Sequence, residues 1–152
     1  MDVVSKGVRS RMMAGIRGKN TKPEILIRHA LHKLGFRSRL HDKSLPGKPD
    51  LVFPKYRAVI LINGCFWHGH QCDLFKWPKT RETFWRAKIA GTIERDTKNL
   101  ELYAKLGWRV LTIWECSIKG AFRRSPEEVA LSAAGWLKSD STHFSIIGTA
   151  SI

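Results

Sequence analysis

The chain has 152 residues, of which 43% are hydrophobic, and this length supports one compact domain rather than two. Twenty-seven Lys and Arg against 13 Asp and Glu give a formal net charge of +14, more than solubility requires, so a polyanion is the expected partner. No run approaches the roughly 18 apolar residues of a membrane span, and no apolar block marks a secretory signal. We therefore expect a cytoplasmic protein that does not enter membranes.

Basic charge is most concentrated in residues 1–22. From Ser5 to Lys22 there are six basic residues, Lys22 included, and no acidic one, interleaved with apolar residues such as Met13 and Ile16. We interpret this segment as an arm that binds nucleic acid, because phosphate neutralisation dominates such affinity. A solvated tail, or attraction to acidic lipid, is the alternative. No long amphipathic pattern with a broad apolar face accompanies the charge, which favours nucleic acid.

The first predicted helix runs from about Pro23 to Leu34 and ends at Gly35. Thr21 and Glu24 have the spacing of a capping box, and Pro23 is tolerated in a first helical turn. Glu24 thus has a structural explanation before any catalytic one.

Two short strands joined by a turn at residues 54–56 are predicted next, in "LPGKPDLVFPKYRAVILING". The run "AVILI" is apolar at every position, as in a strand buried on both faces. A helix from about Arg81 to Leu106 ends at Gly107, the strand "WRVLTIW" follows, and Ser125 caps a last helix.

This order predicts a small single α/β domain with a central mixed β-sheet flanked by helices. We place the domain at residues 23–138. Residues 139–152 carry no clear signal and are left as a tail without an assigned role.

The three cysteines of the chain favour metal ligation over disulfides, since an odd number in a reducing compartment makes a disulfide framework a poor fit. Cys65, His70 and Cys72 are spaced as C-x4-H-x-C, and Cys116 can supply a fourth ligand from the end of a neighbouring strand. Such a shell is closed, as in structural zinc sites. Alternatively, Cys65 and Cys116 are small buried apolar residues.

Three residues between these ligands have no role in the zinc shell. His68 is free for chemistry, although a lone histidine is more often structural. Phe66 and Trp67 are hard to explain as core if a zinc loop holds them near the surface. Exposed aromatics beside basic charge can wedge between base pairs, whereas ordinary burial is the alternative.

The chain resembles the very short patch repair (Vsr) endonucleases from about Arg9 to Gly120. The resemblance is carried, in order and spacing, by "LPGKPDLVF", "GCFWHGHQC", "TRETFW", "ERD" and "LGWRVLTIWEC". It implies a zinc-bearing, PD-(D/E)xK nuclease-like fold. It also implies a bacterial enzyme, associated with the nucleoid when on DNA, that nicks one strand 5′ to the thymine of a T:G mismatch. Such enzymes work next to a cytosine-5 DNA methyltransferase and hand the nick to mismatch-repair proteins.

The resemblance also implies roles for individual residues. Asp50 and the main-chain carbonyl of Ile62 would bind Mg²⁺, which prefers few carboxylates plus waters and phosphate oxygens. His68 would be the general base and Asp96 its orienting partner. Glu24 corresponds to an acidic residue near the metals. Zinc would be held by Cys65, His70, Cys72 and Cys116.

Further residues correspond to DNA contacts. Phe66, Trp67 and Trp85 match an aromatic wedge that enters from the major groove. Met13 and Ile16 match residues that approach from the minor groove, while Lys88 matches a contact to the mismatched pair. At Asn63 the chain departs from the histidine of well-known members. Asparagine still donates a hydrogen bond but supplies neither a proton nor a positive charge.

Two other functions stay open. The first is a restriction-type or nicking endonuclease without a strict mismatch requirement. The second is a non-catalytic zinc DNA-binding module, consistent with the net charge and with Asn63. We expect a monomer, which suits a single-strand nick.

Overall fold

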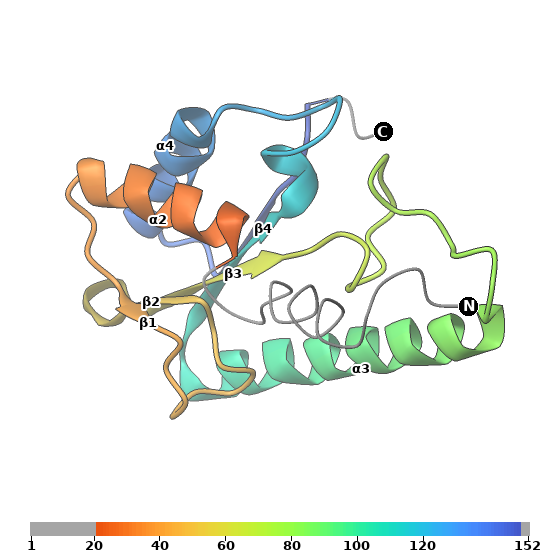
Figure 1. Ribbon diagram of the computed structural model, residues 1–152. Coiled ribbons are helices and arrows are strands. Elements are labelled where there is room, and N and C mark those ends of the chain that lie inside the picture. Colours follow the sequence, from red (N-terminus) through yellow and green to blue (C-terminus); the bar gives the residue numbers. More distant parts are fainter. Residues whose placement is uncertain (1–20, 150–152) are drawn as a thin grey trace, which may run out of the picture.

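The computed structural model describes residues 21–149, so the predicted basic arm, with Met13 and Ile16, lies largely outside the described residues. Five strands form one sheet in the order β1-β2-β3-β4-β5 (Figure 1). Neighbours are antiparallel from β1 to β3 and parallel from β3 to β5, which confirms the predicted mixed sheet. The strands are β1 (Arg39–Leu40), β2 (Leu51–Phe53), β3 (Ala58–Asn63), β4 (Arg109–Trp114) and β5 (His143–Ile146).

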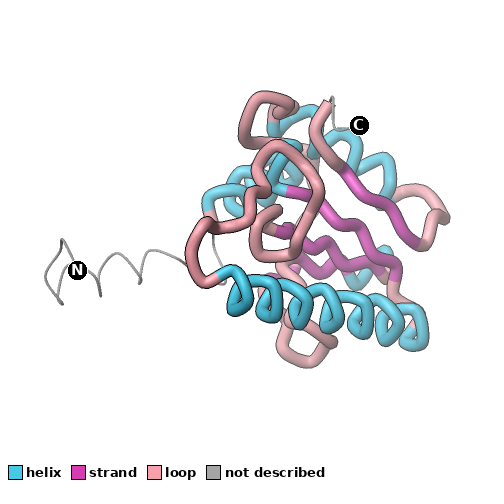
Figure 2. The backbone as a smooth tube through the Cα atoms, turned by 90° about the vertical axis from the view of Figure 1, so that its right-hand side faces the viewer, coloured by secondary structure: helices cyan, strands magenta, loops and turns pink. Residues whose placement is uncertain are grey.

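Helices cover both faces of the sheet, as Figures 1 and 2 show. The pair α2 (Lys22–Lys33) and α4 (Pro126–Leu137) covers one face, and the long helix α3 (Glu82–Leu106) covers the other. Two short 3-10 turns, η1 (Pro54–Tyr56) and η2 (Glu115–Ser117), follow β2 and β4. Within residues 21–149, none of the helices combines the length and apolar character needed to cross a membrane.

The helix ends follow from local sequence, as predicted. Both hydrogen bonds of the capping box are present: the N–H of Glu24 donates to Thr21 Oγ1 over 3.4 Å, and the N–H of Thr21 donates to Glu24 Oε2 over 3.3 Å. The hydroxyl of Ser125 accepts the N–H of Glu128 at 3.1 Å. Gly107 ends α3 with a φ of 78°, a left-handed conformation that glycine adopts without strain.

Alternation along β3 divides the core into two clusters. Ile60 packs towards α2 and α4, whereas Val59 packs towards α3 beside the fully buried Tyr103. The first three residues of "AVILI" are therefore buried on both faces, as predicted, whereas Leu61 and Ile62 are only partly buried. The hydroxyl of Tyr103 donates to the carbonyl of Pro46, so the loop before β2 is fixed against α3.

Part of the segment left without a role belongs to the sheet. Strand β5 pairs in parallel with β4, and Ile146 is its buried residue. Just beyond it, Gly148 lies so close to the chain that a Cβ there would be 2.9 Å from the carbonyl oxygens of Cys116 and Phe122. The end of the described chain thus packs directly behind Cys116.

Arg109, at the start of β4, joins three parts of the fold through backbone carbonyls. Its Nη2 donates to Tyr56 at 3.0 Å and to Leu137 at 2.8 Å, while Nη1 donates to Trp136 and Ser141, each at 3.2 Å. The guanidinium also lies 4.6 Å from the centroid of the Trp136 ring. One planar side chain therefore holds η1, the end of α4 and the approach to β5 together.

Arg109→Lys is expected to lower the free energy of unfolding by about 2 to 4 kcal/mol, because an ammonium cannot reach these carbonyls in one plane. Urea denaturation followed by circular dichroism measures this. Arg86→Lys is the matched control, since Arg86 forms an exposed ion pair with Glu82 on α3. That change is expected to alter stability by less than about 0.5 kcal/mol. Equal effects of the two substitutions would contradict a structural role for Arg109.

Candidate active site and metal centres

Polar residues meet where β3 and β4 end together. Asn63 and Trp114 are paired in register there, and Asp50 directly precedes β2 beside them. A cleft of about 730 Å³ opens between this end of the sheet and α3. Its lining includes four of the predicted catalytic residues, Asp50, Asn63, His68 and Asp96, and also Ile62, whose carbonyl is the predicted Mg²⁺ ligand; Glu24 does not line it.

His68 and Asp96 form a direct pair in the cleft. Nδ1 of His68 lies 2.6 Å from Oδ2 of Asp96, although the residues are 28 positions apart. Their side chains are 23% and 34% exposed, so both are accessible to water. A carboxylate at Nδ1 favours the tautomer that carries its proton there, which leaves Nε2 able to accept a proton. The arrangement can therefore activate a water molecule.

The glycine after His68 allows this pair to form. Gly69 has a φ of 64°, and a Cβ there would lie 2.9 Å from side-chain atoms of both Ile89 and Ile93 on α3. The loop that carries His68 thus packs tightly against α3. Asp96 lies one helical turn beyond Ile93, within reach of the imidazole.

Asp50 is held against the neighbouring strand. The N–H of Ile62 donates to Oδ2 of Asp50 at 2.7 Å, which leaves Oδ1 without a hydrogen bond from Ile62. Burial raises the pKa of Asp50 to about 6 against the opposing effect of that N–H, and the carboxylate of Glu24 also raises it. The charged form of Asp50 is therefore destabilised in the cleft, and a nearby cation would stabilise it.

Asp50→Asn is expected to stabilise the protein without added Mg²⁺ by about 1 to 3 kcal/mol at pH 7.5, since it removes a poorly solvated charge. Because the folded pKa is raised to about 6, the destabilisation by Asp50 is fully present above that pH. It fades as pH falls through 6 and is absent below the unfolded value near 3.8. Thermal melts of both proteins from pH 4 to 8 measure the difference in stability between Asp50→Asn and the wild type. A difference that does not change with pH would contradict this prediction.

Glu24 and His41 join Asp50 in one cluster. One ligand atom from each of these three residues lies within 4.8 Å of the others. Glu24 is almost fully buried, and its Oε1 contacts Nε2 of His41. Sequence reasoning missed His41, since nothing in "RLHDKS" distinguishes it from an exposed loop histidine. The donors of this cluster suit a divalent cation.

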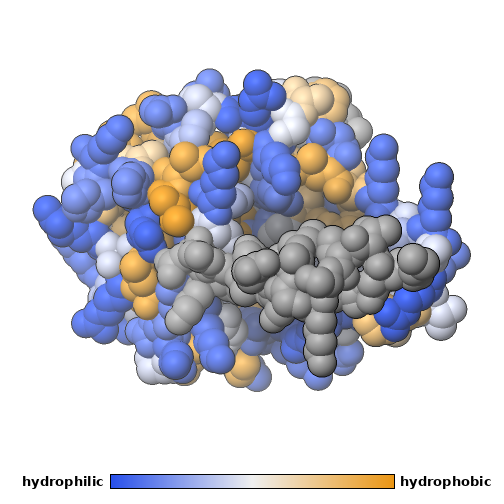
Figure 3. All heavy atoms as spheres, in the orientation of Figure 1, coloured by the Kyte–Doolittle hydropathy of each residue, from blue (hydrophilic) through white to orange (hydrophobic). Residues whose placement is uncertain are grey.

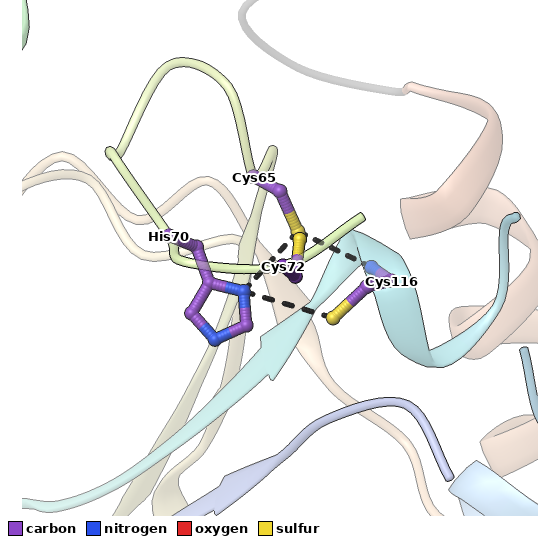
Figure 4. Close-up of side chains that lie close together, drawn as sticks. All are labelled: Cys65, His70, Cys72 and Cys116. Atoms are coloured by element: carbon purple, nitrogen blue, oxygen red, sulfur yellow. Dashed lines mark hydrogen bonds between the residues drawn. The ribbon is translucent and has the colours of Figure 1, made fainter. Parts of the chain in front are cut away.

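The four predicted zinc ligands converge, as Figure 4 shows. Nδ1 of His70 lies 3.5 Å from Sγ of Cys65 and 3.7 Å from Sγ of Cys116, and Cys72 completes a group within 4.8 Å. Cys65 and Cys116 are fully buried. His70 also stacks on Trp114, with ring centroids 4.1 Å apart.

The chemistry of these donors fits a zinc ion. Burial raises the pKa of the Cys65 and Cys116 thiols and lowers the pKa of His70. Without a cation the thiols of Cys65 and Cys116 and the His70 imidazole are therefore favoured in their neutral forms. A bound divalent ion would stabilise thiolates, and three sulfurs with one imidazole form a closed tetrahedral shell.

Aromatic rings form a partly exposed cluster beside the cleft. The ring centroids of Phe66, Trp67 and Trp85 are 5.3 to 5.8 Å apart, and Trp67 is 43% exposed. Ordinary burial does not explain Trp67. Phe75 and Trp77 extend the cluster, although sequence reasoning missed them; the signal was the spacing "FKW" in the same loop.

The two remaining predicted residues lie on α3 and at the end of β3. Lys88 is exposed on α3 one turn beyond Trp85, and Asn63 lines the cleft. The structure thus brings Asp50, Ile62, Asn63, His68 and Asp96 together in the cleft, while the predicted zinc ligands and the aromatic rings form two further clusters.

A family model and several known proteins match the sequence of this chain. The family model described as DNA mismatch endonuclease Vsr matches residues 1–74. The DNA mismatch endonuclease Vsr of Escherichia coli is 41% identical over 136 residues, which cover 90% of this chain and 87% of that protein. The type II nicking enzyme V.XorIIP of Xanthomonas oryzae is 44% identical over 117 residues, covering 77% and 86%. V.NmeAIP, a type II nicking enzyme of Neisseria meningitidis, is 45% identical over 118 residues, covering 78% and 84%.

A cleft with an imidazole–carboxylate pair, together with these matches, defines the class of protein as a DNA endonuclease, a hydrolase. Cleavage of this kind generally uses a divalent metal ion. More narrowly, the chain belongs to the family of the DNA mismatch endonuclease Vsr.

Proposed function

We propose that the protein is a strand-specific endonuclease that nicks 5′ to the thymine of a T:G mismatch in very short patch repair. The observation that carries the proposal is the pairing of His68 with Asp96 in the same cleft as Asp50. The mismatch endonuclease among the relatives supports the choice of substrate. A zinc-bearing PD-(D/E)xK nuclease-like fold and a monomer are part of the same proposal.

The proposed mechanism gives each residue one task. Asp50 and the carbonyl of Ile62 would hold Mg²⁺, which supplies electrostatic stabilisation of the phosphate when bound. His68 accepts the proton of the attacking water at Nε2, while Asp96 keeps Nδ1 protonated and the ring oriented. Asn63 can donate a hydrogen bond to the phosphate. The departing oxygen therefore takes its proton from water rather than from residue 63.

The DNA surface proposed here combines charge and exposed aromatics. Hydrophilic side chains dominate the face in Figure 3, with smaller hydrophobic patches between them. Phe66, Trp67 and Trp85 would enter the duplex at the mismatch, with Lys88 against the mismatched pair. Residues 1–22 are proposed as the arm, in which Met13 and Ile16 approach from the minor groove.

Trp67→Ala is expected to weaken binding to a T:G duplex by about 1 to 3 kcal/mol, in the range of a lost base–aromatic stack, and to weaken matched-duplex binding less. Fluorescence anisotropy with both duplexes measures this. Leu131→Ala, which removes an exposed hydrophobic side chain on α4, is the control. Equal losses on both duplexes would show that Trp67 contributes only general affinity.

The main test uses duplexes end-labelled on each strand separately, with a T:G mismatch or the matched C:G pair, in several flanking sequences, with and without Mg²⁺. A nick on the thymine strand only, and only with Mg²⁺, is the expected result. No metal-dependent nick on any mismatched duplex would overturn the proposal. Binding without cleavage would instead indicate a non-catalytic zinc DNA-binding module.

A second candidate function is a nicking endonuclease without a strict mismatch requirement. It is favoured by the relatives named as type II nicking enzymes. Equal cutting of the matched duplex in the same assay would establish it. In either case the proposed setting is the bacterial cytoplasm, on nucleoid DNA, next to a cytosine-5 methyltransferase and upstream of mismatch-repair proteins.

A further inference from the structure

His41 is a partly buried histidine beside Glu24, and the proposed mechanism gives it no role. It directly follows β1, and its N–H donates to the carbonyl of Asp50 at 3.3 Å, so it lies opposite Asp50 across the strand pair. Its φ of 49° is left-handed, and β1 ends at the preceding residue. The strand pairing itself therefore places an imidazole beside the carboxylate proposed to bind the metal.

Glu24 reaches the same point from another element. It comes from the first turn of α2 and is 1% exposed, and its Oε1 contacts Nε2 of His41, which is 17% exposed. The capping box uses the other carboxylate oxygen, Oε2. The oxygen that faces His41 is thus separate from the one that caps the helix.

Three donors from three elements are therefore close enough for one cation. Donors bound to a common divalent ion at about 2.0 to 2.6 Å lie at most about 5 Å apart. The ligand atoms of Glu24, His41 and Asp50 lie within 4.8 Å of one another. Glu24 is buried and Asp50 is partly buried, so their two carboxylates repel each other, and Glu24 is among the causes that raise the pKa of Asp50. A cation between them removes that repulsion.

We infer that His41 is the third side-chain donor of this cation site, so that Glu24, His41 and Asp50, beside the main-chain carbonyl of Ile62, bind a divalent transition ion such as Mn²⁺ as well as Mg²⁺. Coordination through Nε2 uses the neutral imidazole, with its proton on Nδ1. A nitrogen donor contributes more to binding a transition ion than to binding Mg²⁺, which prefers oxygen. The inference rests on the proposed function only in taking this cluster as the catalytic metal site.

Pulsed electron paramagnetic resonance tests this with Mn²⁺ as the probe, on the purified full chain without DNA. Coupling of Mn²⁺ to a ¹⁴N nucleus reports a coordinated imidazole and does not depend on cleavage. Wild-type protein is expected to show this coupling. His41→Gln should lose it and bind Mn²⁺ about tenfold or more weakly, with a smaller change for Mg²⁺.

Two further variants make the result decisive. His29→Gln replaces an exposed histidine on α2 and should leave both coupling and affinity unchanged. Asp50→Asn should abolish Mn²⁺ binding while the protein stays folded by circular dichroism. Mn²⁺ bound by the wild type without ¹⁴N coupling, coupling retained in His41→Gln, or no Mn²⁺ binding in the free protein would each overturn the role of His41.

The nicking assay separates this inference from the proposed function. If His41 is not a donor but wild-type protein still nicks T:G duplexes with Mg²⁺, the proposed function stands and His41 only pairs with Glu24. If the ¹⁴N coupling is present but no duplex is nicked, the metal site stands and the proposed function fails.

Discussion

His68→Ala is expected to lower the nicking rate on a T:G duplex by roughly 10²- to 10⁴-fold, the usual contribution of a general base. The imidazole is the group in the cleft that a carboxylate already orients, at 2.6 Å from Nδ1. Its removal takes away the proton acceptor but leaves the cysteine cluster and the aromatic rings in place. Single-turnover cleavage gives the rate, and anisotropy on the same duplex should show affinity within about threefold of wild type, since phosphate contacts dominate it.

Asp96→Asn and His32→Ala complete that experiment. Asparagine can hold the ring but stabilises the protonated imidazole less, so the rate is expected to fall by a smaller factor than in His68→Ala. His32 lies on the exposed face of α2 and its replacement should leave the rate unchanged. Cleavage by His68→Ala at the wild-type rate would remove this residue as the base.

The second large effect is expected for Cys116→Ser, which should abolish the proposed zinc binding and lower the free energy of unfolding by about 4 kcal/mol. Cys65 and Cys116 are 51 positions apart, and joining them through a metal closes a long loop. Loop-closure entropy for such a length corresponds to about 4 kcal/mol, before any effect of unpaired buried thiols is added. Mass spectrometry of the metal content and urea denaturation measure the two outcomes.

Ser117→Ala separates metal loss from local packing in that experiment. Ser117 is equally buried in the same turn, and its hydroxyl donates to the carbonyl of Trp114 at 2.7 Å. Its replacement should cost about 1 kcal/mol and leave the zinc content unchanged. Normal zinc content and stability in Cys116→Ser would show that Cys65 and Cys116 are only small buried apolar residues.

The helices and central strands could be predicted because their signals are local. Thr21 and Ser125 cap α2 and α4 through side-chain oxygens a few residues away, and Gly107 supplies the left-handed turn that ends α3. Residues 58–62 of β3 are apolar because both faces of the strand pack against helices. These features depend on neighbours in sequence rather than on the final fold.

The edge strands could not be predicted, for the opposite reason. Both residues of β1 are exposed, and in β5 only Ile146 is buried, so neither strand shows a periodic apolar pattern. Their pairing depends on the neighbouring strands that are already in place. Parallel pairing of β5 with β4 also requires the α4 crossover, which no local signal encodes.

The candidate site likewise contains residues with a local sequence signal and residues that only the fold brings together. The cysteine cluster was predictable because three of its four members lie in one short motif. His41 was not, since its proximity to Glu24, 17 positions earlier, arises only when β1 pairs with β2. Nor does sequence show that the N–H of Ile62 donates to Asp50. That bond comes from the antiparallel register of β2 and β3.

The loop that carries Phe66, Trp67 and His68 is fixed at both sides, by the cysteine cluster and by the contact of Gly69 with α3. Phe66, Trp67 and His68 are consecutive in this loop, so a displacement of the two rings also displaces the imidazole. If the rings enter DNA as proposed, a duplex that resists opening would hold the imidazole away from the phosphate. The protein would then discriminate between the two duplexes in the rate of cleavage as well as in affinity, and matched DNA that does bind would be left intact.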